Sequence, residues 1–246
     1  SAIKELYDIV VDKNADPECI RALYSSLQRL DPEIVRQCGI KSLSFEDLGP
    51  SKEYYPNHGK YVNNTLVLNT QLLTDPLIVV DPDYKSILNK FDQTLYHELG
   101  HGWDEFQGEG GELCLKDEWL SLSGWSKYPK PGYKRIHIKE KGTPEIIGDY
   151  YYSPYAQFTR FYAKRNPWDD WADSFSYYVG GAKSYLPKNK IEYFDKMLKK
   201  ALPGKKVAKH LKEDIKEQKH AIKKDKGLMK SMKKGLNMLI KLNTFH

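Results

Sequence analysis

Apolar side chains recur every three or four positions through much of residues 1–40, which is the spacing of helices with one buried face. Asp16-Pro17 can begin one helix, and Asp31-Pro32 can begin a second, shorter one that Gly39 would end. The apolar face of the first helix consists of Ile20, Leu23, Leu27 and Leu30. We therefore expect residues 1–40 to be helical.

Two segments that follow have the pattern of strands. Residues 41–45 alternate between polar and apolar positions, with Leu43 and Phe45 on one face. Residues 61–68 are richer in β-forming side chains and form the second expected strand. Together they predict a small sheet. The second strand is either an ordinary member of that sheet or one to which an extended peptide can add by main-chain pairing.

A longer amphipathic helix is expected over residues 82–106. Asp81-Pro82 is a good helix start, and the glycines at 108, 110 and 111 supply a stop. The apolar positions that recur at helical spacing are Ile87, Leu88, Phe91, Leu95 and Leu99.

This helix carries the sequence HELGH at residues 97–101. His97 and His101 are four residues apart, so they lie one above the other on one face and both imidazoles can reach a single metal ion. Glu98 can act as general base towards a water molecule at that ion. The pattern predicts a catalytic zinc site, which needs a third protein ligand.

The third ligand is not a histidine of the metzincin type, because the required position is Gln107. No Asn-Glu-x-x-Ser-Asp segment follows, which argues against the thermolysin type. The remaining candidate is the acidic helix start at residues 166–175, where Asn166 can cap the helix and Asp169 and Asp173 share a face. Asp169 can either ligate metal or complete a capping box, and the local sequence allows both.

Two motifs resemble the zinc-peptidase group that includes anthrax lethal factor and the bacterial Pro-Pro endopeptidases. The first is HExGHxxD at residues 97–104, and the second is YxxxNxxDxxADxF at residues 162–175. In that group a tyrosine precedes the third zinc ligand by seven residues and a second acid follows the ligand by four. The resemblance covers about residues 60 to 180. The group usually has Glu at both acidic positions, where this chain has the shorter Asp.

The resemblance implies a zincin-like peptidase domain with zinc bound by His97, His101 and Asp169. It implies Glu98 as the general base and Tyr162 as the group that stabilises the transition state. Tyr155 is an alternative phenol without the expected offset. Asp173 would orient a histidine from behind, and Asp104, three residues past His101, would make a similar outer contact.

The stretch between the motifs, residues 108–165, is expected to be rich in loops and in aromatic side chains. Some of these aromatic residues would belong to the core and others would line the active-site cleft. In peptidases of the resembled group, a strand before the active-site helix commonly borders that cleft, and residues 61–68 are the matching segment.

The last segment, residues 205–246, differs in character because it holds thirteen Lys and four acidic residues, a net charge of +9. It is expected to form two helices hinged near Gly227. They either pack on the domain with a solvated Lys face or adhere to an anionic surface such as membrane, nucleic acid or cell-wall polymer. The expected domains are therefore a catalytic domain at 1–204 and a Lys-rich helical appendage at 205–246.

Composition is compatible with one α+β, mostly α, enzyme domain, since 40% of the residues are hydrophobic. The sequence has no clear nucleic-acid motif, and no apolar run approaches the ~20 residues of a membrane span. Cys19 and Cys38 could form a disulfide that leaves Cys114 single, or all three could be buried thiols. The chain begins without Met, which is compatible with a removed signal peptide and a secreted or periplasmic location, or with a trimmed chain.

Three functions remain open from the sequence. The first is a zinc-dependent endopeptidase that acts on proteins or peptides. The second keeps this chemistry but acts on cell-wall peptides. The third is a non-catalytic protein that binds its partner through the basic C-terminal helices.

Overall fold

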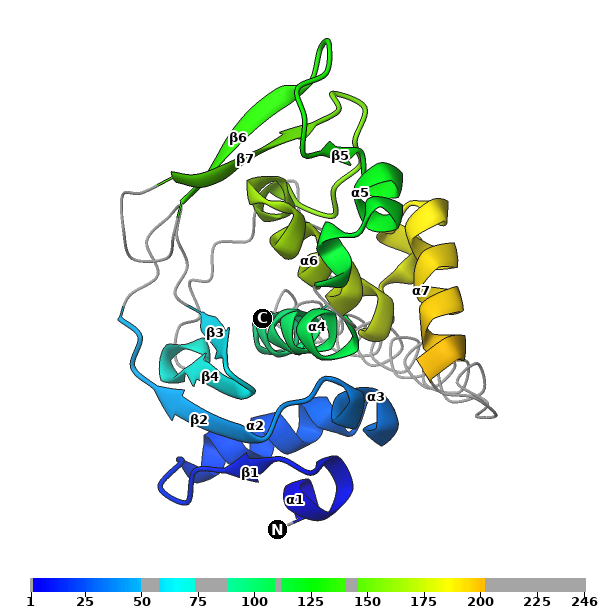
Figure 1. The fold of residues 1–246 in the computed structure, drawn as a ribbon. Coiled ribbons are helices and arrows are strands. Elements are labelled where there is room, and N and C mark those ends of the chain that lie inside the picture. The colour runs from blue at the N-terminus through cyan, green and yellow to red at the C-terminus, as the bar shows by residue number, and fades with distance from the viewer. Residues whose placement is uncertain (1, 50–57, 74–87, 109–111, 140–145, 202–246) are drawn as a thin grey trace, which may run out of the picture. The chain divides into compact units, whose positions relative to one another are not determined.

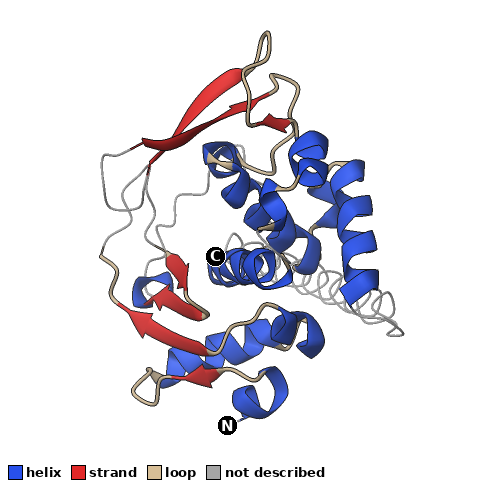
Figure 2. Cartoon of the chain, viewed as in Figure 1, coloured by secondary structure: helices blue, strands red, loops and turns tan. Residues whose placement is uncertain are grey.

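The computed structural model of the chain describes residues 2–49, 58–73, 88–108, 112–139 and 146–201. These residues form an α+β fold in which helices accompany two small sheets (Figure 1, Figure 2). The α-helices are α1 (Ala2–Tyr7), α2 (Pro17–Leu27), α3 (Pro32–Gln37), α4 (Lys90–Gln107), α5 (Asp117–Ser123), α6 (Pro167–Val179) and α7 (Lys188–Ala201). The strands are β1 (Val10–Val11), β2 (Ser42–Glu46), β3 (Gly59–Val62), β4 (Thr65–Asn69), β5 (Trp125–Ser126), β6 (Lys134–Lys139) and β7 (Ile146–Tyr152). Short 3₁₀ turns lie at η1 (Thr70–Leu72), η2 (Leu113–Leu115), η3 (Phe161–Arg165) and η4 (Lys183–Tyr185).

The expected N-terminal helices are confirmed as α2 and α3. Asp16 and Asp31 cap them, and each aspartate side chain accepts the backbone N–H of the residue two positions on. Gly39 follows α3 in the left-handed region at φ +69°, where glycine is favoured. The expectation of a wholly helical N-terminus was wrong at β1, whose two residues are too few to show any periodicity.

The first sheet has the strand order β1-β2-β4-β3. β2 pairs in parallel with β1 and β4, while β3 is antiparallel to β4. The single strand expected over residues 61–68 was therefore wrong, because the chain reverses in the middle of this segment. Asn63 and Asn64 both have positive φ, as a two-residue hairpin turn requires, and asparagine tolerates that conformation.

α4 runs between this sheet and α6, and most of its residues are buried (Figure 1). Asn89 caps it by accepting the backbone N–H of Asp92, so the helix begins at Lys90. The expected start at residue 82 was wrong, since Leu88 and Asn89 are not helical, and residues 81–87 lie outside the described part. On the sheet side of α4, the rings of Phe45 and Phe91 stack at 6.4 Å.

α6 packs against α4 on one side and against α5 and α7 on the other, around a cluster of large aromatic side chains. Trp119, Trp171, Phe175 and Phe194 are all fully buried there. Asp170 points into the same region, where it accepts a hydrogen bond from Trp125 and pairs with the buried Lys190. This core explains the apolar face of the helix that was expected at residues 166–175.

The second sheet is antiparallel, with the order β5-β7-β6, and it lies on the opposite side of α4 and α6 from the first (Figure 1). Residues 108–165 were expected to be rich in loops, with no strand foreseen, and the structure adds these three strands. β6 and β7 are hidden in the sequence because Lys, Arg, His and Gly interrupt their apolar positions.

Cys19, Cys38 and Cys114 are free and buried, which is the second of the two alternatives for these residues. Among the described helices, none is both long and apolar enough to cross a membrane. The two helices expected in residues 205–246, and the domain boundary before them, lie outside the described residues.

Candidate metal centre

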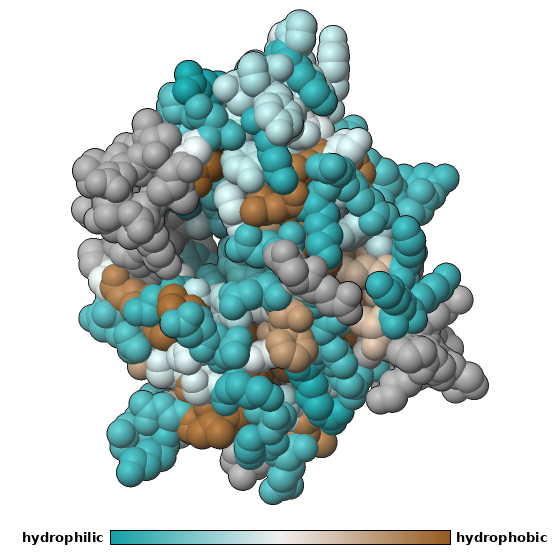
Figure 3. Space-filling view, viewed as in Figure 1, coloured by the Kyte–Doolittle hydropathy of each residue, from teal (hydrophilic) through white to brown (hydrophobic). Residues whose placement is uncertain are grey.

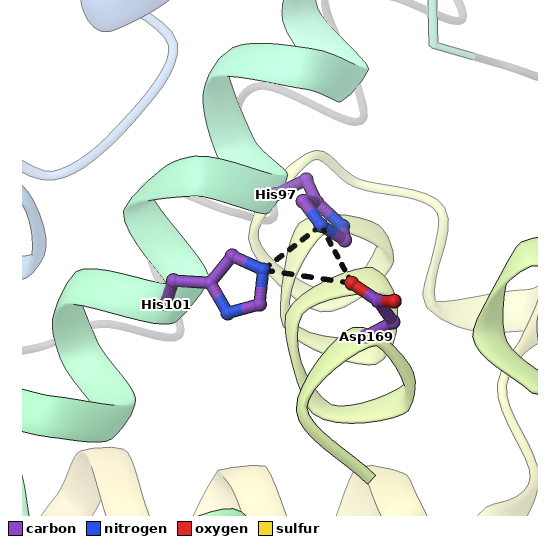
Figure 4. Close-up of side chains that lie close together, drawn as sticks. All are labelled: His97, His101 and Asp169. Atoms are coloured by element: carbon purple, nitrogen blue, oxygen red, sulfur yellow. Dashed lines mark hydrogen bonds and ion pairs between the residues drawn. The ribbon is translucent and has the colours of Figure 1, made fainter. Parts of the chain in front are cut away.

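α4 and α6 together bring three potential metal ligands to one point (Figure 4). His97 and His101 project from successive turns of α4, and their Nε2 atoms lie 3.1 Å apart. Asp169 projects from the first turn of α6, and its Oδ1 lies 3.6 Å from Nε2 of His97 and 3.7 Å from Nε2 of His101. No other such group of His, Cys, Asp or Glu occurs within the described ranges.

These separations suit a zinc ion. A tetrahedral ion with bonds of about 2.0–2.1 Å would hold its ligand atoms about 3.3–3.4 Å apart. The triangle formed by the three donor atoms has a circumradius of about 2 Å, so one ion could contact all three atoms. Two imidazoles and one carboxylate are also a donor set that zinc accepts in catalytic sites.

Asp169 has a second role, as part of the N-terminal cap of α6. Its backbone N–H donates to Oδ1 of Asn166 at 2.7 Å, and its own Oδ2 accepts from Nδ2 of Asn166 at 2.8 Å. The sequence left capping and metal ligation as alternatives. In the structure the bond to Asn166 uses Oδ2 while Oδ1 faces the two histidines, so capping and metal ligation are compatible.

Asp173 lies one turn further along α6 and is completely buried. Its Oδ1 accepts a hydrogen bond from Nδ1 of His97 at 2.7 Å. This bond makes Nδ1 the donor, so in the neutral imidazole, the form that binds a metal, the Nε2 lone pair faces His101 and Asp169. Burial alone would lower the pKa of His97, but the carboxylates of Asp173 and Asp169 outweigh it and raise this pKa to about 10.

Arg160 also binds the Asp173 carboxylate. Its Nε donates to Oδ2 of Asp173 at 2.6 Å, and its NH2 group donates to Oδ1. Burial would raise the pKa of Asp173, but the charges of Arg160 and His97 lower it well below its usual range. Asp173 is therefore a carboxylate with two charged partners, and the chain of contacts runs from Arg160 through Asp173 to His97.

Tyr162 lies against the same group of residues. Its ring packs edge-on against His97 with the centroids 5.7 Å apart, and the guanidinium groups of Arg160 and Arg165 lie 4.8 and 4.6 Å from its centre. Burial, together with the nearby Asp169, raises the pKa of Tyr162, so the phenol is neutral at pH 7. Tyr155, the alternative phenol, has a side chain exposed to solvent.

Glu98 is buried on α4 beside the first strand of the β3–β4 hairpin. A Cβ atom placed on Gly59 would lie only 3.1 Å from Cγ and from Oε1 of Glu98. A glycine at this point of β3 is therefore what allows the strand to pass so close to the Glu98 carboxylate.

Asp104 is buried on α4, and its Oδ1 accepts the backbone N–H of Cys114 at 2.7 Å. Burial raises its pKa to about 7. This contact joins α4 to η2.

Three residues of the site were not anticipated from the sequence, namely Arg160, Gly59 and His58. Burial and the charges of Lys90, Arg160 and His97 lower the pKa of His58 to about 3, so its imidazole is neutral near the metal-ligand group. Of these three residues, only Arg160 has a weak signal in the sequence, because it lies two residues before Tyr162, where the second motif begins.

Comparison of the chain with models of protein families and with curated proteins found no match.

Proposed function

We propose that the protein is a zinc-dependent endopeptidase with a zincin-like active site. The observation that carries the proposal is the triangle of His97, His101 and Asp169, with Asp173 bonded behind His97. The likeness of the two motifs to the lethal factor and Pro-Pro endopeptidase group supports the same function.

The residues of the site would divide the reaction among them. A zinc ion held by the three ligands would polarise the scissile carbonyl and favour ionisation of water. Glu98 would accept the proton of the attacking water and deliver it to the leaving amine. Tyr162, as a neutral phenol, would donate a hydrogen bond to the carbonyl oxygen as negative charge develops there.

β3 would present the substrate. It is the last strand in the order β1-β2-β4-β3, so within the described residues one of its edges pairs with β4 and the other pairs with no strand. An extended peptide that added to this edge would pass close to Glu98, because Gly59 of β3 lies against its side chain. The surface is hollowed between the β3–β4 hairpin and strands β6 and β7 (Figure 3).

Metal content tests the proposal directly. The purified protein should carry about one zinc per chain, and His97→Ala or His101→Ala should remove it, since each ligand supplies a large part of the affinity. Elemental analysis after dialysis measures this, with His137→Ala, an exposed histidine on β6, as the matched control. Full zinc occupancy in the double variant at positions 97 and 101 would refute the site.

Cleavage profiling separates the three functions. Mixed peptide libraries should yield products if the protein is an endopeptidase, whereas products from peptidoglycan fragments alone would assign it to cell-wall peptides. Zinc binding without any cleavage would favour the non-catalytic protein that acts through its basic C-terminal segment. A secreted or periplasmic location remains part of the proposal.

Arg160→Ala should weaken zinc binding by roughly 10-fold, the lower end of the cost of losing an outer partner of a metal ligand. The reason is that Asp173 would lose the group that fixes its orientation towards His97. Zinc affinity measured against a chelating indicator checks this. Arg135→Ala, which removes an exposed arginine paired with Asp149, should leave the affinity unchanged. Equal affinity in the Arg160 and Arg135 variants would contradict the positioning role.

A further inference from the structure

We infer that Gly100 and Ala172 set the close approach of α4 and α6 that allows a side chain as short as aspartate to complete the metal centre. The inference rests on the proposed metal site and concerns how this chain builds it. Gly100 and Ala172 act as positioning residues, because glycine has no side chain and the alanine side chain has no atom that could bind the metal.

Gly100 lies where α4 packs directly against the backbone of α6. It is buried on α4, directly before His101. A Cβ atom built on it would lie 3.0 Å from Cα and 3.2 Å from the carbonyl oxygen of Ala172, and 3.3 Å from Cβ of Phe175. Since two of these atoms belong to the backbone of α6, rotation of a side chain could not relieve the contact. The helix itself would have to move.

The same contact governs the distance between the ligands. Ala172 lies three residues after Asp169, less than one turn of α6, and Gly100 adjoins His101. A change in helix separation at Gly100 is therefore passed almost directly to the gap between Asp169 and the histidines. Asp169 cannot follow by itself, because its backbone N–H and its Oδ2 are both bonded to Asn166.

Metal ligands tolerate little displacement. Ligand distances in a working site fall within about 0.2 Å of their usual values. A Cβ contact at 3.0 Å must open by several tenths of an ångström to reach ordinary van der Waals distance. Gly100→Ala should thus carry Oδ1 of Asp169 out of bonding range, although alanine is the better helix former and should favour α4 itself.

The test is a double-mutant cycle between positions 100 and 169. Gly100→Ala should weaken zinc binding at least 10-fold. Asp169→Glu adds one methylene, which should more than bridge the new gap, so the double variant should bind zinc within about 3-fold of the wild type. In the wild-type protein, which keeps Gly100, the same Asp169→Glu change should weaken zinc binding several-fold, because the longer side chain overfills the site. The sign of the Asp169→Glu effect is therefore expected to reverse between the two backgrounds.

Gly102→Ala is the matched control on the same helix. A Cβ atom there would lie 2.5 Å from the carbonyl oxygen of Cys38, on the side of α4 that does not face α6. This variant should lower the melting temperature of the metal-free protein. Adding Asp169→Glu to Gly102→Ala should raise neither the stability nor the zinc affinity of that variant. The reason is that the contact with Cys38 does not set the distance between residue 169 and the histidines.

Zinc affinity should be measured with a competing indicator, ligand geometry by the absorption spectrum of bound Co²⁺, and folding by circular dichroism. Unchanged affinity in Gly100→Ala, or no rescue by Asp169→Glu, would overturn the inference. If Gly100→Ala does not fold, the Asp169→Glu variant still decides, since zinc binding tighter than the wild type would refute a spacing matched to aspartate. A wild-type protein that binds no zinc would instead refute the proposed function.

Discussion

Glu98→Gln should stop peptide hydrolysis while the protein keeps its zinc. The amide has nearly the same shape as the carboxylate, so it can occupy the same place against Gly59, and Glu98 is not one of the three ligand residues. It cannot accept a proton, however, and loss of a general base costs roughly 10²- to 10⁴-fold in rate. We expect a loss of this size in turnover, measured on a peptide chosen by library profiling, with the zinc content unchanged.

Glu118→Gln provides the control for this experiment. Glu118 is an exposed residue of α5 that pairs with Lys196, so the same chemical change there should leave the rate unaffected. Unchanged turnover in Glu98→Gln would mean that another group acts as the base. Loss of zinc in that variant would instead assign Glu98 a structural part in the metal centre.

The parts of the fold that were foreseen depend on local chemistry. Asp16, Asp31 and Asn166 each precede a proline and cap a helix, and these starts could be predicted because the capping bond lies within two or three residues. The start of α4 could not be predicted in this way. Asp81-Pro82 has the same local pattern, yet the helix through the site begins at Lys90, after a cap by Asn89.

The sheets were harder to foresee because strand pairing is not local. Asn63-Asn64 divides a continuous β-forming run into two strands, and only a turn between hydrogen-bonded partners reveals this. β5 pairs with β7 across 25 to 27 residues, as between Trp125 and Tyr152, and β6 pairs with β7 across as many as 18 residues. Their individual patterns are too short to identify.

The candidate site divides in the same way. The i, i+4 spacing of His97 and His101 and the shared helical face of Asp169 and Asp173 are local facts, and the structure brings these residues together. Arg160 was missed because its part in the site depends on a contact with Asp173, thirteen residues away across η3 and the start of α6. The closeness of Gly100 to Ala172 likewise appears only when the two helices are packed.

Asp169 caps α6 and also lies among the three potential metal ligands, so its variants are the most informative. Asp169→Ala should lose most of the zinc and also lower the stability of the metal-free protein by about 1 kcal/mol, because it removes part of the cap with Asn166. Asp169→Asn should lose zinc with a smaller loss of stability, since its side-chain oxygen can still accept from Asn166 while the charge for the metal is gone. If Asp169 were only a cap, Asp169→Asn would keep its zinc.

Asp173 should behave differently, because it bonds to His97 and would act on a bound metal only through that residue. Asp173→Ala should weaken zinc binding by about 10- to 100-fold rather than abolish it, the usual cost of an outer partner. Zinc affinity and melting temperature, measured with and without zinc for Asp169→Ala, Asp169→Asn and Asp173→Ala, distinguish the two carboxylates. If Asp169→Ala retained zinc and Asp173→Ala lost it, the two roles would be reversed, and α6 would have to present its second turn, rather than its first, to the metal.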